Sequence, residues 1–249
     1  MKALQDIYRQ TLALDDPQLQ LRALDDYIAE IERQKAYNVL ARALVDRIVL
    51  FYNHDMNDSV ITYVPKYRER LKALNKWDKY YELWNNLVNT YVFSGKYNFA
   101  LREVQQMADD AKQRNNNYGM GLAYYAMGNV YCNMHNMEES AASYRKGLDL
   151  LQKVKPLPVT IADLYSYYGD LLNDMKDYER LASLTHEWEP FLKKFFDFHI
   201  VHVRVCFPDL IHDVRVKCLG LPGLFFRLLG KVFFYITAHV GDHPAYFLH

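Results

Sequence analysis

Residues 123–152 read AYYAMGNVYCNMHNMEESAASYRKGLDLLQ and hold one complete copy of a pattern that recurs along the chain. In the first half, apolar side chains recur at the i, i+3, i+7 spacing of one helix face. A polar pair at residues 135–136 interrupts them, and a second apolar stripe follows. The stretch therefore predicts two amphipathic helices joined by a short turn. The stripes are Tyr124, Met127 and Tyr131, then Met137, Ala141, Tyr144, Leu148 and Leu151.

The pattern returns about every forty residues, in units that begin near residues 1, 41, 81, 121 and 162. Shifting the chain by that period aligns Trp84 with Tyr124 and Asn89 with Asn129. One helical hairpin cannot bury its apolar face alone, so neighbouring units must stack. We predict an all-α fold, a right-handed superhelical solenoid of about five hairpins over residues 1–194.

These units resemble the tetratricopeptide repeat (TPR). Tyr124 stands at the first aromatic position of the TPR signature, and Met127-Gly128 stands where Leu-Gly is usual. The unit length is a departure, because a TPR has about 34 residues whereas HEAT-type units have about 40–47. HEAT-like stacking is therefore the structural alternative. The third and fifth units match through Trp84, Leu87, Tyr91, Gly95, Tyr97 and Ala100, and through Tyr165, Tyr168, Gly169, Tyr178 and Leu181.

A few residues predict local features of the fold. Gly128 and Gly169 would let one helix approach its partner closely, and Gly95 would let the chain reverse in a tight turn. Asp16 followed by Pro17 is typical of a helix N-cap and a first-turn proline, so we expect a helix to begin there.

Residues 1–194 also resemble the TPR region of Bacteroides-type signalling and sensor proteins. Such arrays often precede a membrane helix and a histidine kinase or DNA-binding module. The resemblance implies a partner-sensing or ligand-sensing role in bacterial regulation. No kinase or DNA-binding motif is found in this sequence, so the resemblance implies an array without its output domain. An alternative function is therefore that of a sensor fragment of a membrane-bound, histidine-kinase-like regulator.

In the TPR family the concave groove is lined by the first helix of each hairpin, helix A. The resemblance therefore implies partner contacts at helix-A positions rich in amides, which can donate to and accept from a peptide backbone. A carboxylate clamp is rejected, because Asn85 and Tyr125 occupy positions where it needs lysines. The alternative interpretation is that these Asn residues are solvated polar positions on helix A with no role in partner binding. The predicted partner-binding residues are Asn85, Asn89, Phe93, Tyr125, Asn129, Asn133, Ser166, Asp170 and Asn173.

Composition argues against several other classes of function. Lys and Arg number 30 and so do Asp and Glu, which removes the basic excess expected of a nucleic-acid-binding protein. No phosphate loop, nucleophile elbow or dinucleotide fingerprint occurs, so we predict neither an enzyme nor a cofactor. Three cysteines and the absence of a signal-peptide pattern favour a cytoplasmic protein.

Residues 195–249 differ abruptly from the rest, with nine of the thirteen phenylalanines, six of the nine histidines and no Glu, Gln, Asn or Ser. We predict an atypical tail and favour a change of reading frame over a solenoid cap or a membrane segment. Residues 219–240 are long enough to span a bilayer, but Arg227 and Lys231 make spanning doubtful.

The tail also offers an alternative function, metal binding, because imidazole and thiolate groups are the ligand types that zinc prefers. Their spacing matches no zinc motif, and a chance cluster is the favoured interpretation. No metal site is therefore predicted. The residues in question are His199, His202, Cys206, His212 and Cys218.

Overall fold

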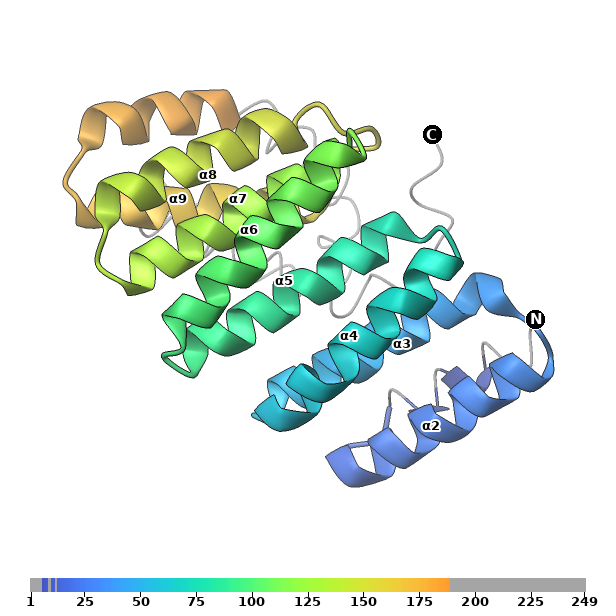
Figure 1. Cartoon of the computed structure of the whole chain (residues 1–249). Coiled ribbons are helices and arrows are strands. Elements are labelled where there is room, and N and C mark those ends of the chain that lie inside the picture. Colours follow the sequence, from blue (N-terminus) through green and yellow to red (C-terminus); the bar gives the residue numbers. More distant parts are fainter. Residues whose placement is uncertain (1–5, 9, 12, 189–249) are drawn as a thin grey trace, which may run out of the picture. The chain divides into compact units, whose positions relative to one another are not determined.

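A computed structural model describes residues 6–8, 10, 11 and 13–188 of the chain (Figure 1). In this described part every regular element is a helix, which confirms the prediction of an all-α fold made of consecutive helical hairpins. The helices are α2 (Pro17–Arg33), α3 (Tyr37–Asn53), α4 (Asn57–Ala73), α5 (Trp77–Phe93), α6 (Tyr97–Gln113), α7 (Asn117–Asn133), α8 (Met137–Leu151) and α9 (Thr160–Asp174). Residues 178–188 form one more helix.

The chain divides into two compact units, Met1–Asn136 and Met137–His249. In the first unit each helix packs on the next, and α5 also contacts both α3 and α7. These three are the A helices of successive hairpins, so stacking of one hairpin on the next is part of the architecture. In the second unit α8 packs on α9. The predicted boundary between residues 194 and 195 lies outside the described residues.

The helices of the first unit follow one another at a regular interval, which is half the length of the forty-residue repeat. Helices α2 to α7 each have 17 residues, and three residues connect each to the next. Helices α3, α5 and α7 therefore begin at Tyr37, Trp77 and Asn117, four residues before the predicted unit starts near 41, 81 and 121. The repeat length of about forty residues is that of two such half-units.

Every connection in the first unit closes its helix in the same way. Gly95 has a φ of +67°, and its N–H donates to the Val92 carbonyl at 2.9 Å. The Lys96 N–H donates to the Tyr91 carbonyl at 2.8 Å, which completes a Schellman motif. The tight turn predicted at Gly95 is confirmed. The residues with the same left-handed backbone in the other connections are Lys35, Asp55, Asn75, Asn115 and His135.

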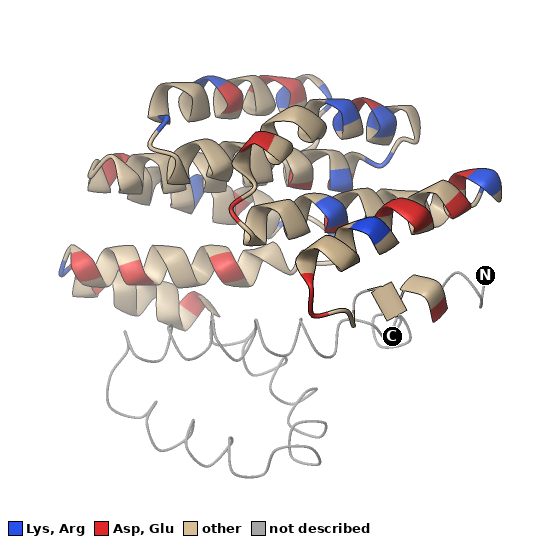
Figure 2. Cartoon of the chain, turned by 90° about the horizontal axis from the view of Figure 1, so that it is seen from below, with Lys and Arg blue, Asp and Glu red and all other residues tan. Residues whose placement is uncertain are grey.

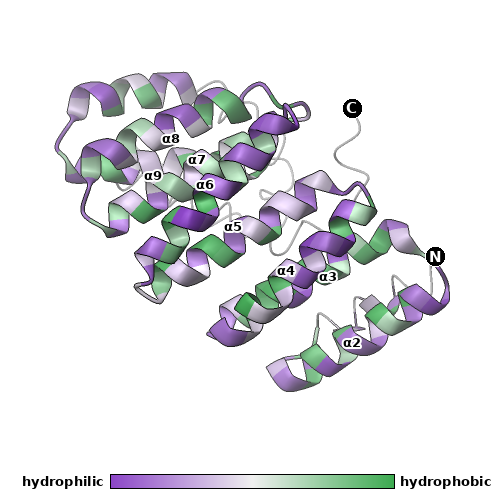
Figure 3. Cartoon of the chain, in the orientation of Figure 1, coloured by the Kyte–Doolittle hydropathy of each residue, from purple (hydrophilic) through white to green (hydrophobic). Residues whose placement is uncertain are grey.

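The predicted start of α2 is also confirmed. The Asp16 carboxylate accepts hydrogen bonds from the backbone N–H groups of Gln18 at 2.7 Å and Leu19 at 3.1 Å, and Pro17 is the first helical residue. Hydrophobic and hydrophilic residues form separate stripes along α2 and α4 (Figure 3). This separation explains why the stripes could be found in the sequence.

Some of the residues that the repeat aligned lie in the interior. Trp84 and Tyr165 are buried in their own units, whereas Tyr124 is half-buried. Gly128 and Gly169 are buried on α7 and α9, as helix-packing positions should be. A close approach of two helices also lies at a glycine that the sequence analysis did not single out. A Cβ atom added at Gly119 would meet the Tyr81 ring of α5.

Candidate partner-binding face

One side of the stacked helices α3, α5 and α7 carries most of the predicted partner-binding residues. Each side chain on it is exposed or half-buried, and pairs from successive A helices touch. We call this surface the A-helix face and define it by Val49, Tyr52, Asn85, Asn89, Phe93, Asn129 and Asn133. It lies wholly within the first unit.

The structure brings together the two asparagines that the repeat aligned. Asn129 Nδ2 of α7 donates to Asn89 Oδ1 of α5 across 3.4 Å, and the two residues are 40 positions apart in the chain. Asn133 Nδ2 donates to the Asn129 backbone carbonyl at 2.9 Å. Within the described residues the Asn89 Nδ2 group has no acceptor, so its two N–H donors remain for a ligand.

Asn85 lies one helical turn before Asn89 on the same side of α5. Its Oδ1 atom is buried and accepts no hydrogen bond from the part of the chain that the structure describes. A buried amide oxygen without a donor is unfavourable, but this atom is shielded from solvent and is not available to a ligand on the face. Of the two asparagines, Asn89 is therefore the one that offers polar hydrogens to a ligand, through its Nδ2 group.

Two aromatic rings, the exposed Phe93 and the half-buried Tyr52, lie at the C-terminal ends of α5 and α3. The Phe93 side chain is 72% exposed, and its ring centroid lies 6.0 Å from that of Tyr52 at an interplanar angle of 60°. Val49, one turn before Tyr52, is 38% exposed. Sequence analysis predicted Phe93 but missed Val49 and Tyr52. The forty-residue repeat could have identified this site, because it aligns Tyr52 with Val92, the residue before Phe93.

Other predicted residues are placed differently. Tyr125 is only 6% exposed, so its ring packs within the first unit. Ser166 and Asp170 are half-buried and Asn173 is exposed, all on α9 of the second unit. Their spacing of four and three residues puts them on one side of that helix.

Several charged groups on α3 and α5 are paired. Lys79 Nζ donates to both oxygens of Glu82 at 2.8 Å, and the Tyr118 hydroxyl donates to Glu82 at 3.1 Å. The Tyr8 hydroxyl donates to Asp46 and accepts from Arg42 Nε at 2.9 Å. Burial, together with the Asp46 carboxylate, raises the pKa of Tyr8, so its hydroxyl stays protonated. Figure 2 shows basic and acidic residues interspersed along the described helices.

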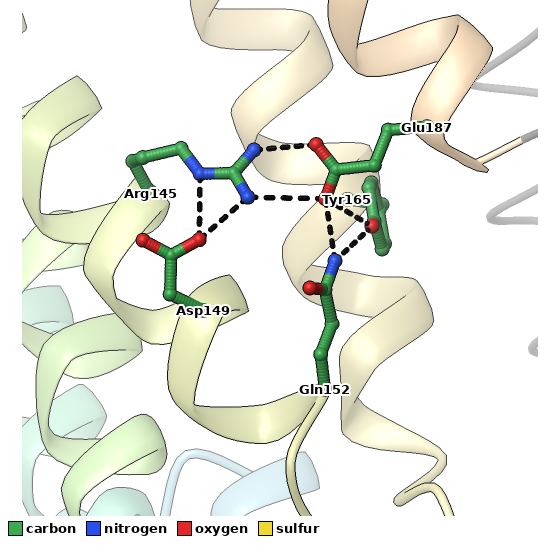
Figure 4. Close-up of polar contacts among 5 residues, drawn as sticks. All are labelled: Arg145, Asp149, Gln152, Tyr165 and Glu187. Carbon is green, nitrogen blue, oxygen red and sulfur yellow. Dashed lines mark hydrogen bonds and ion pairs between the residues drawn. The ribbon is translucent and has the colours of Figure 1, made fainter.

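The second unit contains a network of polar contacts that sequence analysis missed (Figure 4). Arg145 of α8 donates to Glu187 at 2.6 and 3.0 Å and to Asp149 at 2.9 and 2.6 Å. Tyr165 of α9 donates to Glu187 at 2.9 Å, and Gln152 donates to both Tyr165 and Glu187. Burial opposes ionisation of Glu187, but these hydrogen bonds outweigh it and lower the pKa of the carboxyl.

A second ion pair joins α8 to the helix of residues 178–188, with Arg180 donating to Glu138 at 3.2 Å. Both ion pairs join residues that are 42 positions apart in the chain. Opposite charges at that separation could therefore have predicted these contacts from the sequence. A cavity of about 350 Å³ lies beside the bridges. The Glu187 carboxylate already accepts from three side chains, so the network serves to hold the helices together. The cavity is lined by Glu138, Ala141, Ala142, Arg145, Tyr168, Arg180, Ser183, Leu184 and Glu187.

Two sequence-based alternatives concern residues that lie outside the described part. Among the described residues no three His, Cys, Asp or Glu side chains are grouped to hold a metal ion. The tail histidines and cysteines, from His199 to Cys218, are not among them. None of the helices in the described part is long and apolar enough to cross a membrane, and residues 219–240 again lie outside it. Comparison of the chain with protein-family models and with curated proteins gives no match.

Proposed function

We propose that this chain is a TPR-type scaffold that binds a protein or peptide segment on the A-helix face, in bacterial signalling or regulation, and that it is not an enzyme. The single observation that carries the proposal is the contact between Asn89 and Asn129 across successive hairpins. A repeated amide at the same place on stacked helices gives a row of groups suited to a peptide backbone, which needs alternating donors and acceptors.

One further feature of the face supports binding. Phe93 is largely exposed, and a bound segment that covered its ring would remove this apolar surface from water. The regulatory context comes only from the resemblance of the repeats to signalling proteins.

The test is capture of partners from a bacterial lysate by the immobilised full-length chain. The variant Asn89→Ala/Asn129→Ala should lose the captured proteins, because it removes the amides without disturbing buried apolar contacts. The matched control is Asn98→Ala, an exposed asparagine on α6. Equal capture by all three proteins would contradict the proposal.

A further inference from the structure

A cavity of about 350 Å³ lies in the second unit, lined by α8, α9 and the helix of residues 178–188. We call it the α8 cavity. Small residues on two of these helices leave it open, because Ala141, Ala142 and Ser183 lack the long side chains that would fill the space. Its volume lies within the range of pockets that bind small molecules, so the chemistry of its lining decides what it can hold.

The buried part of the lining is apolar except for one hydroxyl group. Ala141, Tyr168 and Leu184 are at most 5% exposed, and Tyr168 alone of the three has a polar side chain. Its hydroxyl has no hydrogen-bond partner among the described residues, and unlike Asn85 Oδ1 its oxygen is not shielded from solvent. Burial raises the pKa of Tyr168, so the group is protonated and can both donate and accept. A ligand in the cavity would supply the missing partner.

The ionised groups of the lining form two pairs of opposite charge. Arg145 pairs with Glu187 at 2.6 Å (Figure 4), and Arg180 pairs with Glu138 at 3.2 Å. No other ionised residue of the described part lines the cavity. A charged ligand would lose its water and meet equal numbers of both signs, each of them already paired. The lining therefore favours a neutral ligand.

Charges near the α8 cavity do not alter this balance. Both arginines also bond a carboxylate that lies outside the lining, that of Asp149 at 2.6 Å and that of Asp177 at 2.5 Å. The same helices carry further exposed charges that do not line the cavity, namely Glu139, Lys146 and Glu179.

The two guanidinium groups favour an aromatic ligand. A guanidinium group can hold carboxylates at its edge while an aromatic ring lies against its plane. Arg47 in the first unit does both, because it bonds a carboxylate of α2 and lies 4.7 and 4.6 Å from the ring centres of Phe51 and Tyr63. No aromatic ring from the described residues lies over Arg145 or Arg180 in this way, so their planes remain for a ligand.

We infer that the α8 cavity binds a neutral, phenol-like ring, which lies against the guanidinium groups of Arg145 and Arg180 and forms a hydrogen bond with the Tyr168 hydroxyl. The inference goes beyond the proposed function, because the cavity belongs to the second unit and the A-helix face to the first.

The experiment is titration of the full-length chain with p-cresol, followed by ligand-observed NMR. We expect saturable binding with a Kd of about 1 mM or below, which a ligand of this size can reach. Toluene, which has the ring without the hydroxyl group, should bind at least roughly threefold more weakly. Benzoate and benzylammonium, which carry a net charge, should bind at least roughly tenfold more weakly than p-cresol.

Three variants locate the bound ring. Ala142→Leu adds a side chain to the lining and should weaken p-cresol binding at least roughly tenfold, because it fills the space that the ring needs. The matched control Ala182→Leu makes the same change at an exposed position outside the lining and should alter the Kd by less than about twofold. Tyr168→Phe should weaken p-cresol binding roughly threefold to tenfold and leave toluene binding unchanged, because only the hydroxyl is lost.

N-acetyltyrosinamide identifies the source of the ring. If it binds more tightly than p-cresol, the ligand is a tyrosine side chain of a partner protein, and if it binds more weakly, the ligand is a free small molecule. Absence of saturable binding, equal binding to Ala142→Leu and the parent chain, or tighter binding of either charged probe would overturn the inference.

Discussion

Gly119 of α7 faces Tyr81 of α5 so closely that a Cβ atom added at Gly119 would lie 2.6 Å from the Tyr81 ring. The ring cannot easily swing away, because the Tyr81 hydroxyl donates to Asp110 of α6 at 2.7 Å and Tyr81 is fully buried. The absent side chain at Gly119 thus allows two successive A helices to pack, and with them the A-helix face to form.

Gly119→Ala should lower the free energy of unfolding by about 1–3 kcal/mol, because overpacking forces the helices apart. Urea denaturation of the full-length chain, followed by circular dichroism, measures the change. Asn117→Ala, an exposed change in the same helix turn, should stay within about 0.5 kcal/mol of the parent chain. An unaltered denaturation midpoint for Gly119→Ala would show that the helices are not in close contact there.

Lys35→Gly should raise the stability by about 0.5–1 kcal/mol. Lys35 has a φ of +55° in the connection between α2 and α3, a conformation that glycine adopts without the strain of a Cβ atom. The same denaturation experiment measures it. The control Ala29→Gly, at an exposed position inside α2, should lower stability by about 1 kcal/mol. If both glycines destabilised, the left-handed turn at residue 35 would be wrong.

Asp16→Ala should cost about 1 kcal/mol, because two backbone N–H groups at the start of α2 would lose their acceptor. Asp15→Ala removes the same charge from the neighbouring exposed position and makes a matched control. Thermal unfolding should separate the two variants, with the lower midpoint for Asp16→Ala. Equal midpoints would exclude the capping role.

Glu187→Gln should reduce stability at neutral pH by roughly 1 kcal/mol, a value reduced for partial exposure of the ion pair. Because the pKa of Glu187 is lower in the folded state, its contribution is present above the ordinary pKa of about 4.3. The contribution disappears as the pH falls through the lowered value.

Denaturation of the parent chain and of Glu187→Gln from pH 7 down to pH 3 tests this dependence. The difference between them should shrink on acidification, whereas Glu179→Gln, an exposed change in the same helix, should match the parent throughout. A difference that grew at low pH would have the wrong sign for a carboxylate stabilised by Arg145.

Much of the fold could be predicted from the sequence because its causes are local. The spacing of apolar residues predicted the hairpins. Asp16 followed by Pro17 predicted the start of a helix, and Gly95 predicted a tight turn of the chain. The predicted starts were four residues late because the prediction relied on apolar stripes, whereas α3, α5 and α7 begin directly after their three-residue connections.

The candidate site was less predictable. Repeat alignment correctly paired Asn89 with Asn129, since stacked hairpins bring equivalent positions together. It also placed Tyr125 in the groove, although packing buries that ring, and it overlooked Tyr52. When several helices pack around one helix, they bury positions that a helical wheel of that helix alone would predict to be exposed.

By itself the sequence determined which segments become helices, where they reverse, and that they stack with a period of about forty residues. Only the tertiary structure decided that Gly119 meets Tyr81, that Tyr52 meets Phe93 and that Arg145 meets Glu187. Periodicity fixes which side chains leave water, because that depends on neighbours three or four residues away. Which partner each one then meets depends on the register between separate helices, and that register is set by how all the side chains between them pack.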